Sequence, residues 1–129
     1  MLPFLGDNFG NPSSIHRVGR KARAFLDASR ERVAGVWKCK ASEVIFTSGA
    51  TESINLAICG TARLLKEKGR HLITSPVEHH AVLRSFEYLV NKEGFELTTL
   101  PVDVDGRVNP QDLENAINDD TILVSIMAA

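Results

Sequence analysis

The sequence has few cysteines, few aromatic residues and almost no net charge, and each shortage excludes a class of protein. Only 2 of the 129 residues are cysteine, which excludes a disulfide-held scaffold and favours a reducing, cytoplasmic setting. The formal net charge of −1 gives no electrostatic reason to expect nucleic acid or an anionic membrane surface as a partner. The basic residues between Arg17 and Arg32 fit the solvated face of a helix.

Long hydrophobic runs are also missing. No stretch approaches the roughly 20 apolar residues that span a membrane, and the start lacks the pattern of a signal peptide. Hydrophobic residues still make up 43% of the chain, which is enough for a core. We therefore expect one modest globular domain.

The apolar residues recur with the periods of helices and strands. Strands are predicted at 43–47, 71–74, 95–102 and 121–127, and helices at 15–37, 50–68, 75–94 and from 109 onward. This alternation predicts an α/β fold with a mostly parallel sheet and helices on both faces. The helix at 50–68 is expected to be well buried, and the strand at 121–127 to lie deep in the sheet. Because the chain stops just after that strand, we expect it to be part of something larger.

A turn between a predicted strand and a predicted helix is the first candidate site. Ser48-Gly49-Ala50-Thr51 follows the strand at 43–47 and opens the next helix. Free N–H groups at a helix start bind anions, and the hydroxyl of Thr51 adds a donor. The alternative is an ordinary turn in which Ser48 or Thr51 caps the helix. The pattern matches no nucleotide-binding motif.

A second candidate follows the strand at 71–74. Ser75, Pro76 and Glu78 form the pattern of a helix start with a capping box. The adjacent His79 and His80 point about 100° apart on a helix, so they are badly placed to share a metal ion, and no metal site is expected. One imidazole could stack on a flat ligand or move a proton near neutral pH, and a plain helix-end histidine is the alternative.

Five segments together resemble a known family. "GNPSSIH", "EVIFTSGATESINLA", "EHHAVL", "DGRVNPQDLENAI" and "DTILVSIM" occur in this order in cysteine desulfurases of the NifS and IscS type, and the resemblance runs from Phe9 to Met127. It implies a fold type I enzyme dependent on pyridoxal 5'-phosphate (PLP) and related to class V aminotransferases. Residues 1–129 would form part of its PLP-binding large domain. Such enzymes take sulfur from L-cysteine, leave alanine, and hold a persulfide for iron–sulfur cluster or thio-cofactor assembly.

The resemblance also implies roles for individual residues. Ala50 and Thr51 correspond to contacts of the PLP phosphate. His79 corresponds to the residue that stacks on the cofactor ring and takes part in proton transfer. Asn11 corresponds to a loop near the mouth of the active site and is a weaker, substrate-side candidate.

Several parts of the family pattern are missing from the chain. They include the N-terminal segment and everything after the fourth predicted strand, with the lysine that holds the cofactor and the cysteine that carries the persulfide. Neither Cys39 nor Cys59 matches that cysteine, and both are interpreted as packing residues. We therefore expect the parent protein to be a sulfur-transferring enzyme and this chain alone to be inactive.

Two other functions stay open at this point. One is a related enzyme such as a selenocysteine lyase, which the absent cysteine loop would distinguish. The other is an α/β remnant without catalytic activity. The resemblance implies L-cysteine as substrate, sulfur-acceptor or scaffold proteins as partners, and a homodimeric parent.

Overall fold

The computed structural model describes residues 4–6 and 8–128. The chain divides into two compact units, Met1–Phe46 and Thr47–Ala129, which are treated separately below.

The first unit contains a long helix, α1 (Arg17–Trp37), as predicted. His16 caps its start, because the imidazole Nδ1 accepts the N–H of Gly19 at 3.2 Å. Within the helix only Gly19 and Ala34 are buried. Much of its apolar material is therefore accessible in this structure, and Trp37 is 77% exposed.

The strand predicted at 43–47 is wrong. Ala41–Glu43 forms a short 3-10 helix, η2, and no strand is assigned to the four residues that follow it. Ile45 is 67% exposed and Phe46 is 45% exposed, so the segment is not buried. A strand persists only when its backbone groups are paired, and among the described residues this segment has no partner strand.

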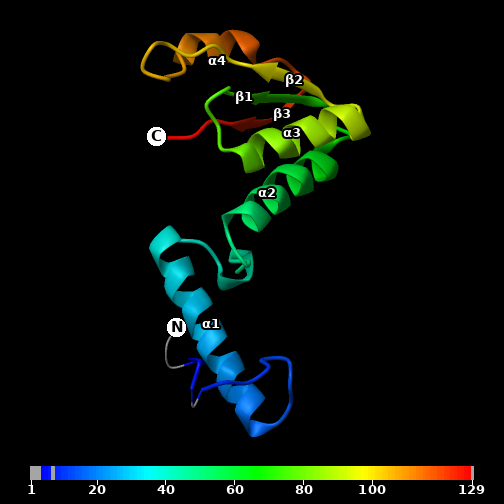
Figure 1. Ribbon diagram of the computed structural model, residues 1–129. Helices are drawn as coiled ribbons and strands as arrows, with labels where there is room; N and C mark the ends of the chain where they lie inside the picture. The colour runs from blue at the N-terminus through cyan, green and yellow to red at the C-terminus, as the bar shows by residue number, and fades with distance from the viewer. Residues whose placement is uncertain (1–3, 7, 129) are drawn as a thin grey trace. The chain divides into compact units, whose positions relative to one another are not determined.

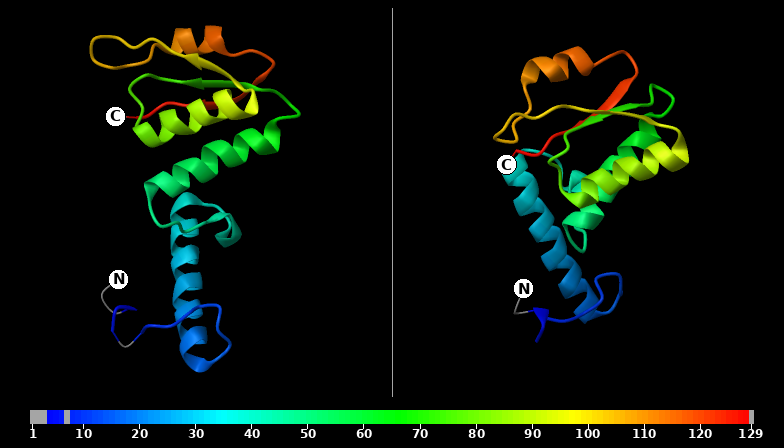
Figure 2. Two further views of the ribbon diagram at one scale, coloured as in Figure 1. Left: turned by 45° about the vertical axis from the view of Figure 1, so that its right-hand side comes forward. Right: turned by 45° about the horizontal axis from the view of Figure 1, so that its top comes forward.

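The second unit holds a parallel sheet, and three helices and three strands alternate along its described residues. Its elements are α2 (Ala50–Leu65), β1 (His71–Thr74), α3 (His80–Glu93), β2 (Glu96–Thr99), α4 (Pro110–Ala116) and β3 (Thr121–Ser125). The strand order is β2-β1-β3, and both pairings are parallel (Figure 1). Helices α2 and α3 lie on one face of the sheet and α4 lies on the other (Figures 1 and 2). The predicted α/β class, with a parallel sheet, is confirmed.

The core lies between β1 and the two helices α2 and α3. All four residues of β1 are buried, and Leu72 packs in a cluster with Phe86 and Leu89 of α3. Cys59 packs against this cluster as expected, whereas Cys39 is exposed.

Two burial predictions for this unit are wrong. The strand β3 lies at an edge of the sheet and is only partly buried, because β1 occupies the central place. Helix α2 buries only Ile58 and Ala62, while Leu56 is 49% exposed and Leu64 is 81% exposed. An apolar pattern around a helix does not by itself say how many neighbours are present to cover it.

Two helix boundaries also differ from the prediction. Helix α3 begins at His80 with His79 as its N-cap, and residues 75–78 form the turn that precedes it. The expected capping box is therefore absent. Ser75 and Glu78 are instead buried, and neither Ser75 Oγ nor Glu78 Oε1 has a hydrogen-bond partner among the described residues. Helix α2 ends at Leu65 rather than at residue 68.

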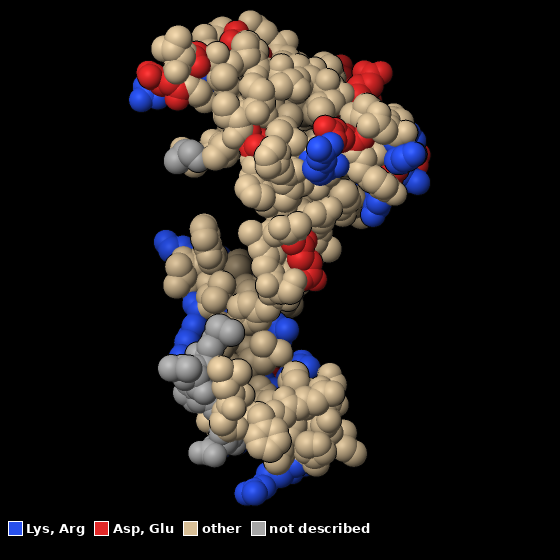
Figure 3. All heavy atoms as spheres, in the orientation of Figure 1, with Lys and Arg blue, Asp and Glu red and all other residues tan. Residues whose placement is uncertain are grey.

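The surface carries both signs of charge. Lys and Arg side chains and Asp and Glu side chains occur in small separate groups on the face seen in Figure 3. Within the described residues, no helix is both long enough and apolar enough to cross a membrane.

Candidate functional site

The start of α2 is open. Its N-cap, Gly49, has an extended backbone with φ 168° and supplies no side-chain cap. The first backbone hydrogen bond of α2 runs from the N–H of Ser53 to the carbonyl of Gly49 at 3.1 Å. The preceding N–H groups, those of Ala50, Thr51 and Glu52, donate to no acceptor in the described part of the chain. Unsatisfied N–H groups of this kind carry the positive end of the helix dipole.

The polar side chains around this turn bond to one another. Glu52 Oε2 accepts both the backbone N–H and the hydroxyl of Ser48, each at 2.7 Å. The Ser48 hydroxyl and then its N–H hold the pKa of the Glu52 carboxyl below its usual range. Thr47 Oγ1 lies 2.6 Å from Ser53 Oγ. The predicted alternative, in which Ser48 or Thr51 caps the helix, is therefore wrong.

Gly49 leaves space in front of the helix. A Cβ added at this residue would meet no protein atom within 4 Å, and its φ is one that any residue adopts. By contrast, a Cβ at Gly69 would collide with the backbone of Asp120. Packing explains the glycine at 69, whereas at 49 a Cβ would point into open space.

The start of α3 is closed by its own N-cap. His79 Nδ1 accepts the N–H of Ala81 at 3.1 Å, and the His79 carbonyl accepts the N–H groups of Val82 and Leu83. The neighbouring ring of His80 lies with its centroid 6.3 Å from that of His79 and is tilted by 58°. His79 alone therefore accepts the N–H groups of Ala81 and Val82, which have no partner within the helix.

The two helices run parallel and in register. Ser85 Oγ lies 3.3 Å from Asn55 Oδ1, and Arg63 binds both carboxylate oxygens of Glu93. Each pair is separated by 30 residues in sequence. The bond from Arg63 is also the main reason why the pKa of Glu93 is lowered.

The same offset sets the starts of the two helices side by side. It pairs the Gly49 position with His79 and the Thr51 position with Ala81. Figures 1 and 2 show both helix starts on the same side of the second unit, at the edge where β1 ends. In parallel α/β sheets, ligands bind at this carboxyl edge.

The fourth candidate, Asn11, lies outside the second unit and is described by itself. Asn11 belongs to the first unit, and its side-chain oxygen accepts the N–H of Ser13 at 2.9 Å. Its carbonyl accepts the N–H of Ser14 at 3.0 Å. Asn11 thus organises its own turn, and its substrate-side role stays a prediction.

Sequence reasoning missed the buried residues of the turn after β1. Ser75 lines a cavity of about 690 Å³ at the carboxyl edge of the sheet, together with Val77, Arg107 and Met127. Ser75 and Glu78 were interpreted as capping residues because their spacing fits that pattern. No feature of the sequence distinguishes a capping serine from one that is buried at the end of a strand.

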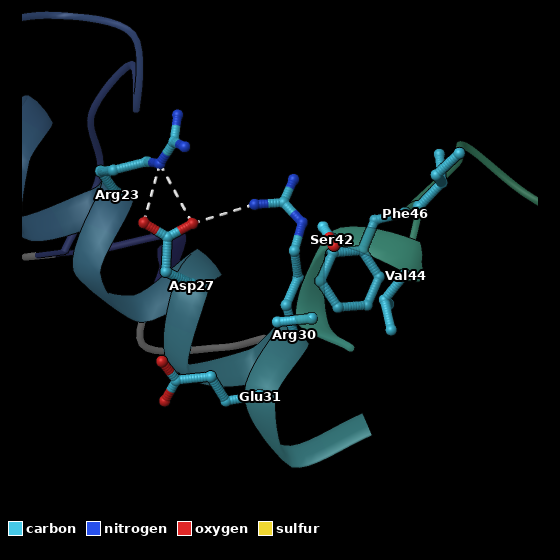
Figure 4. Close-up of a pocket in the computed structure, with 9 residues that line it drawn as sticks. Arg23, Asp27, Arg30, Glu31, Ser42, Val44 and Phe46 are labelled. Carbon is cyan, nitrogen blue, oxygen red and sulfur yellow. Dashed lines mark hydrogen bonds and ion pairs between the residues drawn. The ribbon is translucent and has the colours of Figure 1, made fainter. Parts of the chain in front are cut away.

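A further cavity, of about 640 Å³, lies within the first unit. Figure 4 shows Arg23 and Arg30 both bonded to Asp27, with the guanidinium of Arg30 over the ring of Phe46. Glu31 also lines the cavity, so two cations face two anions. This balance gives the cavity no preference for a charged ligand. No group of His, Cys, Asp and Glu side chains suited to a metal ion occurs in residues 4–6 and 8–128.

Comparisons with known proteins decide the family. The family model "Aminotransferase class-V" matches residues 1–129. The chain belongs to the class-V aminotransferase family. It is 55% identical to a protein named cysteine desulfurase IscS from Dictyoglomus turgidum and 50% identical to one of the same name from Methanosarcina thermophila. Both alignments cover the whole chain but only 32% of each relative, so the chain spans about a third of their length.

Solved structures of this family share the fold. A NifS-like protein matches with a TM-score of 0.91 and 42% identity, covering 99% of this chain and 35% of that protein. A structure titled SspA in complex with cysteine matches with a TM-score of 0.85 and 40% identity, covering 96% and 35% of the two chains. The resemblance to NifS and IscS enzymes predicted from the sequence is confirmed.

Proposed function

We propose that this class-V chain contributes the phosphate site and one wall of the ring site in a PLP-dependent cysteine desulfurase. The observation that carries the proposal is the pair of parallel helices whose starts lie side by side, one open and one closed by His79. The names of the relatives, cysteine desulfurase IscS, support the reaction.

The open end of α2 has the chemistry that a phosphate requires. The N–H groups of Ala50 and Thr51 and the hydroxyl of Thr51 are donors, and the helix dipole favours an anion there. Gly49 leaves room for the anion. These residues fit PLP, and in the proposed enzyme they hold its phosphate.

The start of α3 has the chemistry of a wall for a flat ring. His79 is exposed, and its imidazole is fixed at one nitrogen by the helix cap. When bound, PLP supplies an electron sink for negative charge that develops on the amino acid. In the proposed enzyme, His79 orients the ring and excludes water from one of its sides.

The substrate and partners follow from the reaction. We propose L-cysteine as substrate and a sulfur-acceptor or scaffold protein as partner for the full-length enzyme, which we expect to be a homodimer. Iron–sulfur cluster assembly is the use of the sulfur that the IscS name of the relatives supports. Desulfurase activity is therefore tested in a full-length protein that carries this chain.

The phosphate site is tested on the chain itself. Backbone amide signals are followed by NMR while PLP or inorganic phosphate is added. We expect the signals of Ala50 and Thr51 to move most and those of α1 to stay fixed. Gly49→Ala should weaken the response, because it adds a methyl group to the open space beside the helix start without a clash. Gly35→Ala is the matched control, since a Cβ at Gly35 also meets no atom within 4 Å.

A different result would overturn the proposal. Binding that leaves Ala50 and Thr51 unmoved, or that is unchanged in Gly49→Ala, would place the anion elsewhere.

A further inference from the structure

The hydrogen bonds of His79 distinguish its two ring nitrogens. Nδ1 accepts the N–H of Ala81 at 3.1 Å, and that N–H has no other partner within residues 4–6 and 8–128. The other ring nitrogen, Nε2, makes no hydrogen bond to the described residues. Nδ1 thus caps the helix, and Nε2 is available for a ligand.

This arrangement fixes the place of the proton. A nitrogen that accepts an N–H uses its lone pair, and a neutral imidazole carries its single proton on the other nitrogen. Neutral His79 is therefore the Nε2–H tautomer. We propose that His79 works at the cofactor as a fixed Nε2–H hydrogen-bond donor, positioned by the Ala81 N–H, and does not serve as the general base.

The helix cap occupies the only lone pair of the neutral ring. Nδ1 already accepts the Ala81 N–H, so neither ring nitrogen of the neutral imidazole is left to accept a proton from a ligand. Of the two roles expected from the sequence, stacking or proton transfer, this geometry favours the first.

A donor at Nε2 also limits what lies beside it. Its partner would have to be an acceptor, such as an oxygen or sulfur atom of the substrate that carries negative charge. The identity of that partner rests on the proposed function. The tautomer does not, because it follows from the cap alone.

The chain contains its own controls. His16 caps α1 in the same manner, with Nδ1 accepting the N–H of Gly19 at 3.2 Å. His80 is exposed, and neither ring nitrogen is bonded to the described residues. His71 is buried, and its two nitrogens lie 2.7 and 2.8 Å from the hydroxyls of Thr121 and Thr98. A single spectrum therefore reports the tautomers of all four histidines: the two that cap helices, the buried one and the exposed one.

The experiment is NMR of the 129-residue chain with ¹⁵N-labelled histidine, at a pH where the imidazoles are neutral. We expect His79 and His16 to show the pattern of a pure Nε2–H tautomer and His80 to show an average of both tautomers. Ala81→Pro removes the N–H donor at a first-turn position that tolerates proline. It should shift His79 toward the average of His80 and leave His16 unchanged.

Several outcomes decide the proposal. An Nδ1–H pattern at His79, or an average like that of His80 in the unmodified chain, would overturn it. If Ala81→Pro does not fold, the comparison of His79 with His16 and His80 in the unmodified chain still decides. If Ala81→Pro folds and leaves His79 unchanged, the positioning role of Ala81 is wrong.

A second set of spectra, with PLP added, separates this inference from the proposed function. We expect the Nε2 signal of His79 to move while Nδ1 keeps the signal of an acceptor. Protonation of Nδ1 on PLP binding would restore the base role and overturn the inference. If neither signal moves, His79 does not contact PLP, so the ring wall of the proposed function and the donor role at the cofactor both fail. The tautomer measured without PLP is unaffected by that result.

Discussion

The two helix starts at the edge of the sheet are built in opposite ways. At α2 the N-cap is a glycine without a side chain, and the first N–H groups are left without partners in the described chain. At α3 the N-cap is His79, which accepts the N–H of Ala81 with its ring and the N–H of Val82 with its carbonyl. One helix end is therefore free to bind an anion, and the other holds a ring in a fixed orientation. In the proposed function, the first end receives the phosphate of PLP and the second end lies against its ring.

The largest expected effect is the absence of catalysis by a chain that has these two helix ends alone. We predict that the purified chain releases no alanine from L-cysteine above the rate of free PLP. Binding that is equal in the ground and transition states does not speed a chemical step, and no residue of this chain matches the family's cofactor lysine or persulfide cysteine. The measurement is alanine formation with PLP and cysteine present. Turnover that Thr51→Ala or His79→Ala abolishes would contradict the prediction.

The next effect would close the open helix end. Gly49→Asp supplies an N-cap carboxylate for the free N–H groups of α2, so the fold should gain a few tenths of a kcal/mol relative to glycine. The same carboxylate occupies the phosphate position and repels an anion. We expect the NMR response of Thr51 to phosphate to disappear while the midpoint of urea unfolding rises slightly.

Gly49→Asn is the matched control for charge. It caps the helix equally well without adding a negative charge, so it should also weaken phosphate binding. Unchanged binding in both variants would show that the phosphate does not lie at the start of α2.

The third effect would open the closed helix end. His79→Ala removes the cap of α3 and should lower the free energy of unfolding by about 1 kcal/mol. His79→Asn keeps an acceptor for the Ala81 N–H and should be close to the unmodified chain in stability. Urea unfolding followed by circular dichroism measures both variants. Equal stability of all three proteins would mean that the cap contributes nothing.

The strands were predicted with unequal success for a physical reason. "HLIT" and "EVIFT" are similar short apolar runs, yet only the first forms a strand. His71–Thr74 pairs on both sides, with β2 and with β3. The segment 43–47 pairs with no strand in the described residues. Composition indicates what a strand could bury, but it does not indicate whether a partner strand is present.

The helix starts show a similar limit. The spacing of Ser75 and Glu78 fits a capping box, but α3 begins only after His79. The chain leaves the end of a buried strand at Ser75 and needs several residues to reach the helix layer, as most strand–helix connections do. The turn before α2 was located correctly, because a strand-like run followed by Ser-Gly and a helical pattern shows where the helix begins. That its first N–H groups are free depends on Glu52 bonding Ser48, which the sequence does not reveal.

The smallest expected effect is that of acid on the α2 turn. The pKa of Glu52 is lowered from its ordinary value of 4.5, first by the hydroxyl of Ser48 and then by its N–H. A carboxyl whose folded pKa is depressed stabilises the fold above its unfolded pKa, and this contribution is lost as the pH falls through the folded pKa. The hydrogen bonds between Glu52 and Ser48 should therefore be fully present above pH 4.5 and be lost progressively as the pH falls below that value. Because Glu52 is fully exposed, the change in global stability should be small.

The release should be local, and the first turn of α3 offers the comparison because it contains no acidic residue. We expect the Ser48 amide signal to shift with the titration of Glu52, and this response to be absent in Glu52→Gln. The pKa of the Glu93 carboxyl is also lowered, chiefly by the hydrogen bond from Arg63. Glu52→Gln should leave the pKa of Glu93 unchanged. Amide shifts followed across this pH range in both proteins measure the difference. A Ser48 response that persists in Glu52→Gln would assign the acid sensitivity of the open helix end to another group.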